Sequence, residues 1–144
     1  MKYFSVVVFC LVCILNIKAQ QQHLPEVPAV KKVLQQQQDC WNKGDVFGFM
    51  QGYWQSDSLK FIGKSGISSG WNNTLKRYKE TYPDKESMGT LEFEMISIEP
   101  LSDVSAYVVG KWKLTRSIGN IGGYFTLLFK KINNQWLIVV DHTS

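Results

Sequence analysis

The sequence predicts an α+β domain in which N-terminal helices pack on a strongly bent antiparallel sheet that encloses a conical cavity. Two observations lead to this fold class. Apolar residues recur at helical spacing up to Pro83, and from there to the end of the chain they alternate with polar residues. Helices that precede their strands are typical of a helical layer on one face of a sheet. A sheet that bends around such a layer leaves a cone-shaped space between the two.

The N-terminal segment has the pattern of a secretory signal peptide. Lys2 supplies a positive start, residues 4–17 are apolar apart from two polar side chains, and Ala19 is the small residue of a cleavage site. The apolar run is shorter than the roughly 20 residues that a membrane span needs. We therefore expect export to the periplasm or beyond the cell, without membrane contact after cleavage. The expected divisions are a signal peptide at 1–19, a flexible lead at 20–28 and one domain at 29–144.

Three helices and a short hairpin are expected in the first half of the domain. Apolar residues lie at helical spacing from Val30 to Trp41, and Asp45 can cap the helix that follows. Pro83 ends the third helix because its ring cannot continue one. The predicted segments are helices over 29–42, 46–53 and 71–82, and a hairpin from 59–62 to 67–68.

Four long antiparallel strands are expected after Pro83. Two runs of β-branched and aromatic residues flank Asn133-Asn134, and asparagine tolerates the positive φ of a two-residue hairpin turn. In the first strand, a phase slip at Met95-Ile96 breaks the alternation and indicates a bulge. The predicted strands cover 88–99, 104–116, 124–132 and the run after Asn134.

The C-terminal hairpin decides which side chains face the helices. A symmetric turn pairs Phe129 with Ile138, Leu127 with Val140 and Phe125 with His142. Cross-strand partners point to the same face of a sheet. The predicted inner face therefore holds Phe125, Leu127, Phe129, Trp136, Ile138, Val140 and His142, and it leaves Asp141 on the opposite face.

The chain resembles the nuclear transport factor 2-like (cystatin-like α+β) superfamily, and within it a bacterial domain-of-unknown-function family of the SnoaL-like or kinase II association-domain type. The resemblance covers nearly all of the chain after residue 19. It rests on Trp41-Asn-Lys-Gly-Asp45, Tyr53-Trp54, Phe61-Ile-Gly63, Gly70-Trp71, Tyr82-Pro83 and the segment from Trp136 to Ser144. This superfamily includes polyketide cyclases, ketosteroid isomerases and oligomerisation domains, so the resemblance implies a fold with a pocket but not an activity.

The candidate ligand-binding residues are large aromatic side chains with two polar groups beside them. They are Trp54, Phe61, Trp71, Tyr78, Trp112, Arg116, Phe125 and His142. Strand parity places Arg116 and His142 beside the aromatic residues, where the pair could bind a carboxylate or His142 could act as a general base. The alternative is a histidine held by a backbone carbonyl and an arginine paired with a surface acid. Tyr53, Tyr78 and Tyr82 could donate to an oxyanion.

Several function classes lack support in the sequence. No metal constellation and no cofactor motif is seen, because His142 is the only histidine after the lead and no cysteine accompanies it. Removal of Lys2 and Lys18 with the signal leaves fourteen basic against twelve acidic residues, and pairs such as Lys76-Arg77 are expected to be solvated. Nucleic-acid binding would need a concentrated basic surface. Cys40 is expected to be a packed side chain.

Three functions are compatible with these residues. The first is an exported binding domain that holds a small apolar, anionic molecule. The second is an isomerase-, cyclase- or hydrolase-like enzyme that uses His142 or a tyrosine in acid–base catalysis. The third is a dimerisation module without a ligand. No Tyr-x-Asp signature of a ketosteroid isomerase transfers residue by residue.

Export gives a direct prediction. N-terminal sequencing of the exported protein should begin at Gln20, because cleavage is expected directly after Ala19. A product that retains Met1 in the membrane fraction would contradict this prediction.

Self-association gives a second prediction. Tyr107, Val109, Leu128 and Val139 are expected on the sheet face away from the helices, and three helices cannot cover both faces. An exposed apolar patch of that size is rare on monomers, so we expect a homodimer through this face. Light scattering should report the dimer mass at micromolar concentration, and a monomer mass would count against it.

Overall fold

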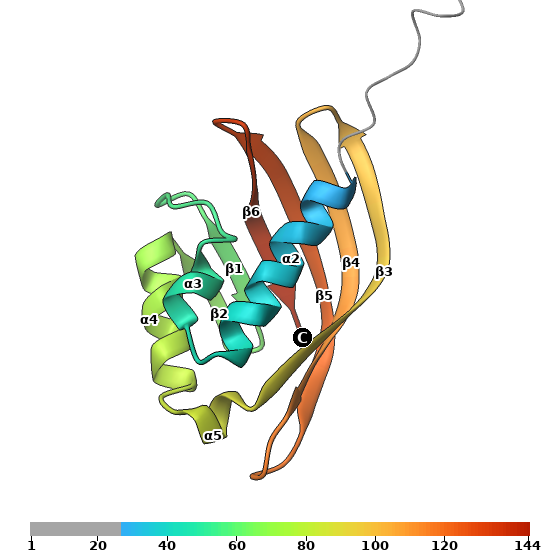
Figure 1. Cartoon of the computed structure of the whole chain (residues 1–144). Helices are drawn as coiled ribbons and strands as arrows, with labels where there is room; N and C mark the ends of the chain where they lie inside the picture. Colours follow the sequence, from blue (N-terminus) through green and yellow to red (C-terminus); the bar gives the residue numbers. More distant parts are fainter. Residues whose placement is uncertain (1–26) are drawn as a thin grey trace, which may run out of the picture.

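The computed structural model describes residues 27–144, so the expected signal peptide at 1–19 and most of the lead at 20–28 lie outside the described residues. Helices pack on the concave face of a curled, open six-stranded sheet, which confirms the predicted α+β class (Figure 1). The elements are α2 (Val27–Asn42), α3 (Val46–Met50), β1 (Lys60–Gly63), β2 (Gly66–Ser69), α4 (Trp71–Thr81), α5 (Lys85–Met88), β3 (Thr90–Ser102), β4 (Ser105–Thr115), β5 (Ile121–Ile132) and β6 (Gln135–Thr143).

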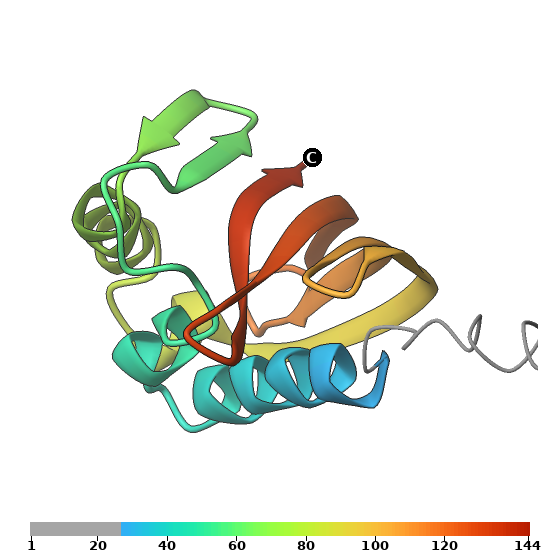
Figure 2. The same cartoon turned by 90° about the horizontal axis from the view of Figure 1, so that it is seen from above.

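The sheet has the strand order β2-β1-β6-β5-β4-β3. All neighbouring strands are antiparallel except β1 and β6, which run parallel with Phe61 opposite Asp141. The short N-terminal hairpin therefore joins the sheet edge, and the wholly antiparallel sheet that we expected is mixed. Figure 2 shows the sheet from above, with the β1–β2 hairpin near the C-terminal end of β6, to which β1 is paired.

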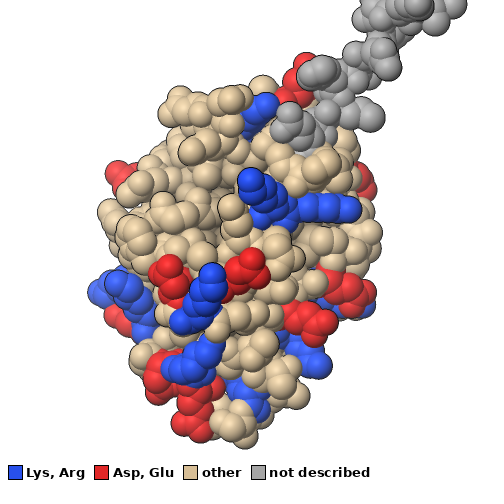
Figure 3. Space-filling model, viewed as in Figure 1, with Lys and Arg blue, Asp and Glu red and all other residues tan. Residues whose placement is uncertain are grey.

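Helix α2 lies along the concave face of the sheet and buries Val30, Leu34 and Trp41 (Figure 1). It begins at Val27, two residues before the predicted start at residue 29. Pro28 fits inside the helix because proline is tolerated in the first helical turn. Basic and acidic side chains are interspersed over this side of the molecule (Figure 3).

Amide side chains of α2 also hold the edge strand β3. The Asn42 side chain donates to the Leu91 carbonyl at 3.0 Å and accepts from the Leu91 N–H at 2.7 Å. The Gln38 side chain accepts from the Phe93 N–H at 2.8 Å. These bonds satisfy backbone groups that a sheet edge leaves without a strand partner.

The connection after Pro83 differs from the prediction, which placed only strands there. Residues Lys85–Met88 form the short helix α5, and Asp84 and Ser87 cap it reciprocally. The Met88 side chain is buried, and its carbonyl accepts the indole N–H of Trp41 at 3.1 Å. The spacing of Asp84 and Ser87 was the available sequence signal for this turn of helix.

The bulge predicted in β3 is confirmed. The register of β3 against β4 shifts between Met95 and Ser97, which leaves Ile96 without a cross-strand partner. Ile96 is 52% exposed, whereas Phe93, Met95 and Ile98 all pack against the core. The extra residue thus keeps the apolar side chains on the inner face on both sides of the bulge.

A second bulge, in β6, was not predicted. The turn at Asn133 and Asn134 has the expected positive φ angles, and Phe129 pairs with Ile138 as expected. Leu128 then pairs with Val140, so that Val139 is the extra residue. Beyond it every side chain changes face relative to our prediction, because side chains alternate along a strand.

The consequence of this bulge falls on the last residues of β6. Asp141 pairs with Leu127 and is buried, whereas His142 pairs with Thr126 and is exposed. The predicted inward placement of Val140 and His142 is therefore wrong, and Asp141 takes the inner position.

Candidate functional site

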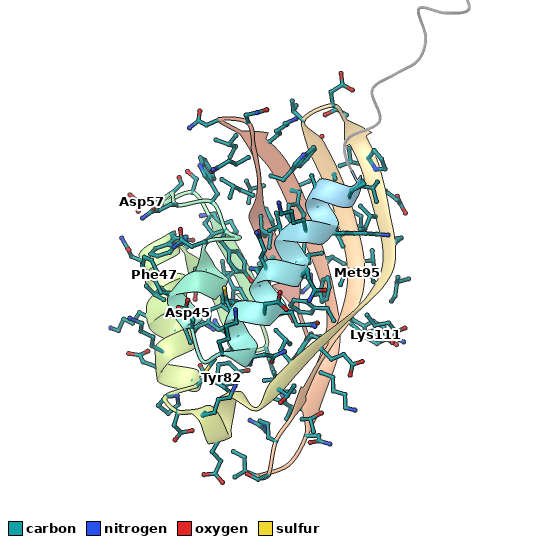
Figure 4. All side chains as sticks on the ribbon, in the orientation of Figure 1. Asp45, Phe47, Asp57, Tyr82, Met95 and Lys111 are labelled. Carbon is teal, nitrogen blue, oxygen red and sulfur yellow. The ribbon has the colours of Figure 1, made fainter. Side chains whose placement is uncertain are left out.

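A cavity of about 470 Å³ lies between the concave face of the sheet and the helices. Its wall is mainly aromatic, with Trp41, Phe49, Tyr53, Phe61, Tyr78 and Phe125 among the lining residues. Trp41, Phe49 and Tyr78 meet edge to face, with ring centroids 5.1 to 5.9 Å apart. Figure 4 shows the side chains that fill the space around α2 and labels Tyr82, which follows α4 and also lines the cavity.

Four of the eight predicted ligand-binding residues line this cavity: Phe61, Tyr78, Trp112 and Phe125. The Phe125 ring lies across Gly110, where a Cβ atom would come within 2.3 Å of the ring. Glycine at this position of β4 therefore leaves the space that the aromatic ring occupies. Any side chain there would push Phe125 further into the cavity.

The other four predicted residues do not line the cavity. Trp71 is buried in the core, where its indole N–H donates to the Met50 carbonyl at 2.9 Å. Trp54 is half-buried, and its backbone N–H donates to the Ile138 carbonyl at 2.9 Å. Both tryptophans therefore join α3 and its following turn to neighbouring elements.

Arg116 and His142 also lie outside the cavity, so the expected pair does not form. Arg116 follows the end of β4, and its guanidinium donates to the backbone carbonyls of Gly119 and Ser87 at 2.8 and 3.3 Å. These bonds fasten the β4–β5 connection to α5. The exposed His142 lies on the outer face of β6 because of the bulge at Val139.

Asp141 is the acid that the β6 bulge brings into the cavity. It is only 5% exposed, and its Oδ2 accepts a hydrogen bond from the Tyr53 hydroxyl at 2.7 Å. Its Oδ1 is buried and has no hydrogen-bond partner among the described residues. The Tyr53 hydroxyl lies 3.3 Å from the Tyr78 hydroxyl.

The backbone around Tyr53 explains how its side chain reaches Asp141. The predicted helix over 46–53 ends at Met50, and Gly52 to Trp54 then run beside β6 through a parallel bridge between Tyr53 and Ile138. Ile138 donates to the Gly52 carbonyl at 2.9 Å. Gly52 and these pairings end the helix early and hold Tyr53 against the end of β6.

Burial controls the protonation of this cluster. It raises the pKa of the Asp141 carboxyl from 3.8 to about 7, although the hydrogen bond from Tyr53 acts in the opposite direction. Burial, and then the charge of Asp141, hold the pKa values of Tyr53 and Tyr78 well above 10. Near neutral pH the cluster therefore has two neutral phenols and one carboxyl that exchanges a proton.

The direction of the hydrogen bonds leaves one polar atom of the Asp141, Tyr53 and Tyr78 cluster without a partner in the described part of the chain. Tyr53 donates its single hydrogen to Asp141, so Tyr78 must donate to the oxygen of Tyr53. Asp141 Oδ1 then remains as the polar atom of this cluster that can serve a bound molecule. When the carboxyl is neutral this atom can donate to a carbonyl, and when it is ionised it can accept from a hydroxyl or an amine.

A second polar group lies where Lys64, Ser65 and Arg77 line the cavity. The guanidinium of Arg77 donates to Ser65 Oγ at 2.6 Å and lies over the Phe61 ring, with 4.9 Å from Cζ to the ring centroid. The sequence suggested solvated side chains for Lys76-Arg77, so this cavity position was missed. The only sequence signal for this position was that Arg77 directly precedes Tyr78, which was expected to face the cavity.

Other expected or candidate groups show no catalytic arrangement. Within residues 27–144, no three His, Cys, Asp or Glu side chains come together to hold a metal ion. The thiol of Cys40 is half-buried on α2, and burial raises its pKa, which is the opposite of activation. No helix in the described part of the chain is long and apolar enough to cross a membrane.

A curled sheet that holds an apolar cavity under helices defines an NTF2-like, or cystatin-like, α+β protein. Among solved structures, the chain is similar to an NTF2-like protein of unknown function from Shewanella oneidensis MR-1, with a TM-score of 0.78 and 44% identity over 81% of this chain and 97% of that one. The chain therefore belongs to the NTF2-like family. No family model and no curated protein matches it.

More distant structures share the fold. A ketosteroid isomerase-like protein from Erwinia carotovora atroseptica SCRI1043 has a TM-score of 0.65 at 14% identity, over 83% of this chain and 95% of that one. An NTF2-like superfamily protein from Salmonella enterica serovar Typhimurium has a TM-score of 0.62 at 19% identity, over 78% and 85%. At these identities the likeness concerns the fold alone.

The raised pKa of Asp141 predicts how stability depends on pH. The unfolded chain ionises this carboxyl near pH 3.8, whereas the folded protein keeps its proton up to about pH 7. The folded protein is therefore stabilised by the protonated Asp141 carboxyl. This contribution to the free energy of unfolding is complete below pH 3.8 and is lost as the pH rises through about 7. A pKa gap of about 3 corresponds to at most about 4 kcal/mol.

Replacement of Asp141 by asparagine should remove this dependence. Relative to Asp141→Asn, the free energy of unfolding of the wild type should fall between pH 4 and pH 7, as measured by urea denaturation at each pH. His142→Gln, which changes the exposed side chain directly after Asp141, is the control and should keep the wild-type profile. Parallel profiles for wild type and Asp141→Asn would show that the carboxyl is not perturbed.

Proposed function

We propose that the protein is an exported small-molecule-binding protein whose cavity holds a mostly apolar ligand with an acidic group. The observation that carries the proposal is Asp141, which lines the cavity and whose buried Oδ1 has no hydrogen-bond partner among the described residues. A buried polar atom without a partner costs about 1–3 kcal/mol. A ligand that supplies the missing hydrogen bond would recover part of that free energy.

The size and wall of the cavity support the same proposal. A volume of about 470 Å³ lies within the range of roughly 300 to 1,000 Å³ that is usual for small-molecule sites. Such sites combine an apolar wall with a few convergent polar groups. Here the wall is aromatic, and Asp141 with Tyr53 supplies the polar group.

A second candidate function is acid–base catalysis in the same cavity. It is favoured by the pKa of Asp141, since a general acid or base works best when its pKa is near the working pH. The proton would move between Asp141 Oδ1 and the ligand atom that it contacts, while Tyr53 holds Oδ2 in place. Asp141 therefore replaces His142, which we had expected in this role.

Export and self-association remain parts of the proposal. Export is supported by the pattern of residues 1–19. Self-association through the outer sheet face is supported by the half-buried Tyr107, Val109 and Leu128. Val139 no longer belongs to that argument, because it is the buried bulge residue of β6.

A matched pair of ligands tests the role of Asp141. 2-Acetylnaphthalene can only accept a hydrogen bond, whereas 1-(2-naphthyl)ethanol can also donate one. As the pH rises through about 7 and Asp141 ionises, affinity for the ketone should fall by about tenfold, the effect of one lost hydrogen bond, and affinity for the alcohol should not. Fluorescence titrations between pH 5 and pH 9 measure both affinities.

Variants complete this test. Asp141→Asn can donate at every pH, so its affinity for the ketone should be independent of pH. His142→Gln should retain the pH dependence of the wild type. If the ratio of ketone affinity to alcohol affinity does not change with pH in the wild type, the proposed hydrogen bond between Asp141 and the ligand is refuted. Deuterium uptake from D₂O into the methyl group of the ketone, lost in Asp141→Asn, would favour catalysis over binding alone.

A further inference from the structure

We infer that Arg77 binds the acidic group of the ligand at the mouth of the cavity, so that the ligand is an amphipathic anion with its neutral polar group at Asp141. The inference rests on the proposed function and names the ligand class for the same cavity. The acidic group is a carboxylate, sulfonate or phosphate, since these share the oxyanion geometry that a guanidinium recognises.

The first step is the way Arg77 is held. It projects from α4 across the β1–β2 hairpin, where Nη2 donates to Ser65 Oγ at 2.6 Å and Nη1 donates to Ser68 Oγ at 3.3 Å and to the Gly66 carbonyl at 3.4 Å. The guanidinium also lies over the Phe61 ring. A group fixed in this way loses little conformational entropy when it binds a ligand.

Gly63 makes this position accessible to the guanidinium. A Cβ atom at residue 63 would lie 2.8 Å from Arg77 Nη2 and 3.1 Å from the Phe61 ring. Gly63, Phe61 and Arg77 all line the cavity. The absence of a side chain at Gly63 therefore lets the cation rest at the mouth, between the hairpin and the aromatic wall.

The second step is the charge that Arg77 leaves uncompensated. Each of its hydrogen-bond partners is neutral. The two ion pairs among residues 27–144 join Lys76 to Glu80 and Lys111 to Glu94, so neither involves Arg77. Arginine in proteins keeps its charge at all ordinary pH values.

The mouth of the cavity has basic side chains. The charged side chains of the lining are the cations Lys64 and Arg77 and the acid Asp141, whose pKa is raised to about 7. The charge of Arg77 reaches the aromatic wall, since it opposes the rise in the pKa values of Tyr78 and Tyr82 that burial causes. Such a field attracts an anion into the cavity.

The third step is the orientation of the ligand. An acidic group at the floor would meet Asp141, and two carboxylates in one apolar site repel each other. At the mouth the same group meets Arg77 and remains partly solvated. The ligand therefore lies with its acidic end at Arg77, its apolar body against the aromatic wall, and a hydroxyl or carbonyl group at Asp141.

A competing role for Arg77 is purely structural, because its bonds join α4 to the β1–β2 hairpin. The experiment must therefore change the charge at the mouth without removing the arginine. Ser65 allows this, since it is an exposed turn residue whose Oγ contacts the guanidinium. Ser65→Asp places an acid against Arg77, and Ser65→Asn is a neutral variant of similar size.

The probes are two fluorophores with one skeleton. 8-Anilinonaphthalene-1-sulfonate is anionic, and N-phenyl-1-naphthylamine lacks the sulfonate. The purified wild-type protein should bind both, with the sulfonate bound more tightly and its affinity decreasing as salt is added. Ser65→Asp and Arg77→Met should weaken sulfonate binding by about three- to tenfold, which is the effect of a partly exposed charged hydrogen bond. Neither substitution should change binding of the neutral probe by more than about twofold.

Controls separate the possible outcomes. Ser65→Asn is the neutral reference for Ser65→Asp, and the sulfonate should bind more weakly to Ser65→Asp than to Ser65→Asn. Equal losses for both probes, or no loss for either, would overturn the role of Arg77 and leave the proposed function in place. A wild type that binds neither probe would instead count against the proposed function itself. If Arg77→Met does not fold, the comparison of Ser65→Asp with Ser65→Asn decides the question.

Discussion

The bulge at Val139 in β6 is the constraint on which the site depends. Up to Ile138 the hairpin keeps the register that its turn imposes, and the core residues Phe129 and Ile138 meet across it. One extra residue then reverses the faces of the final strand segment. Because of that reversal Asp141 lies under the helices, within reach of Tyr53, and every polar interaction at the floor of the cavity follows from it.

The two bulges show how far the sequence could predict the sheet. In β3 the bulge was visible because polar residues flank the apolar pair Met95-Ile96, so the phase slip stood out. In β6 the run from Leu137 to Val140 is apolar at every position, and it fits either register equally well. Alternation carries no information when both faces of a strand are apolar. The fold class was predictable because helical spacing and alternation can be read over most of the chain. The face of Asp141 was not predictable, because the run before it does not alternate.

The polar residues of the cavity were hard to predict because long-range contacts determine their surroundings. Tyr53 was expected at the end of a helix, yet it bridges to Ile138 and meets an acid from the far end of the chain. Arg77 stands beside lysine in a polar helix, so sequence alone gave it a solvated role. Large aromatic residues were a partial guide to the cavity, since Phe61, Tyr78, Trp112 and Phe125 line it whereas Trp54 and Trp71 pack elsewhere.

The amide bonds from α2 to β3 bear on how the chain avoids aggregation. An edge strand offers free N–H and carbonyl groups to which another molecule could add a strand. Here Asn42 occupies both backbone groups of Leu91, and Gln38 occupies the N–H of Phe93. The helix thus shields part of its own sheet edge from intermolecular pairing. Loss of these amides would therefore affect solubility as well as the stability of the fold.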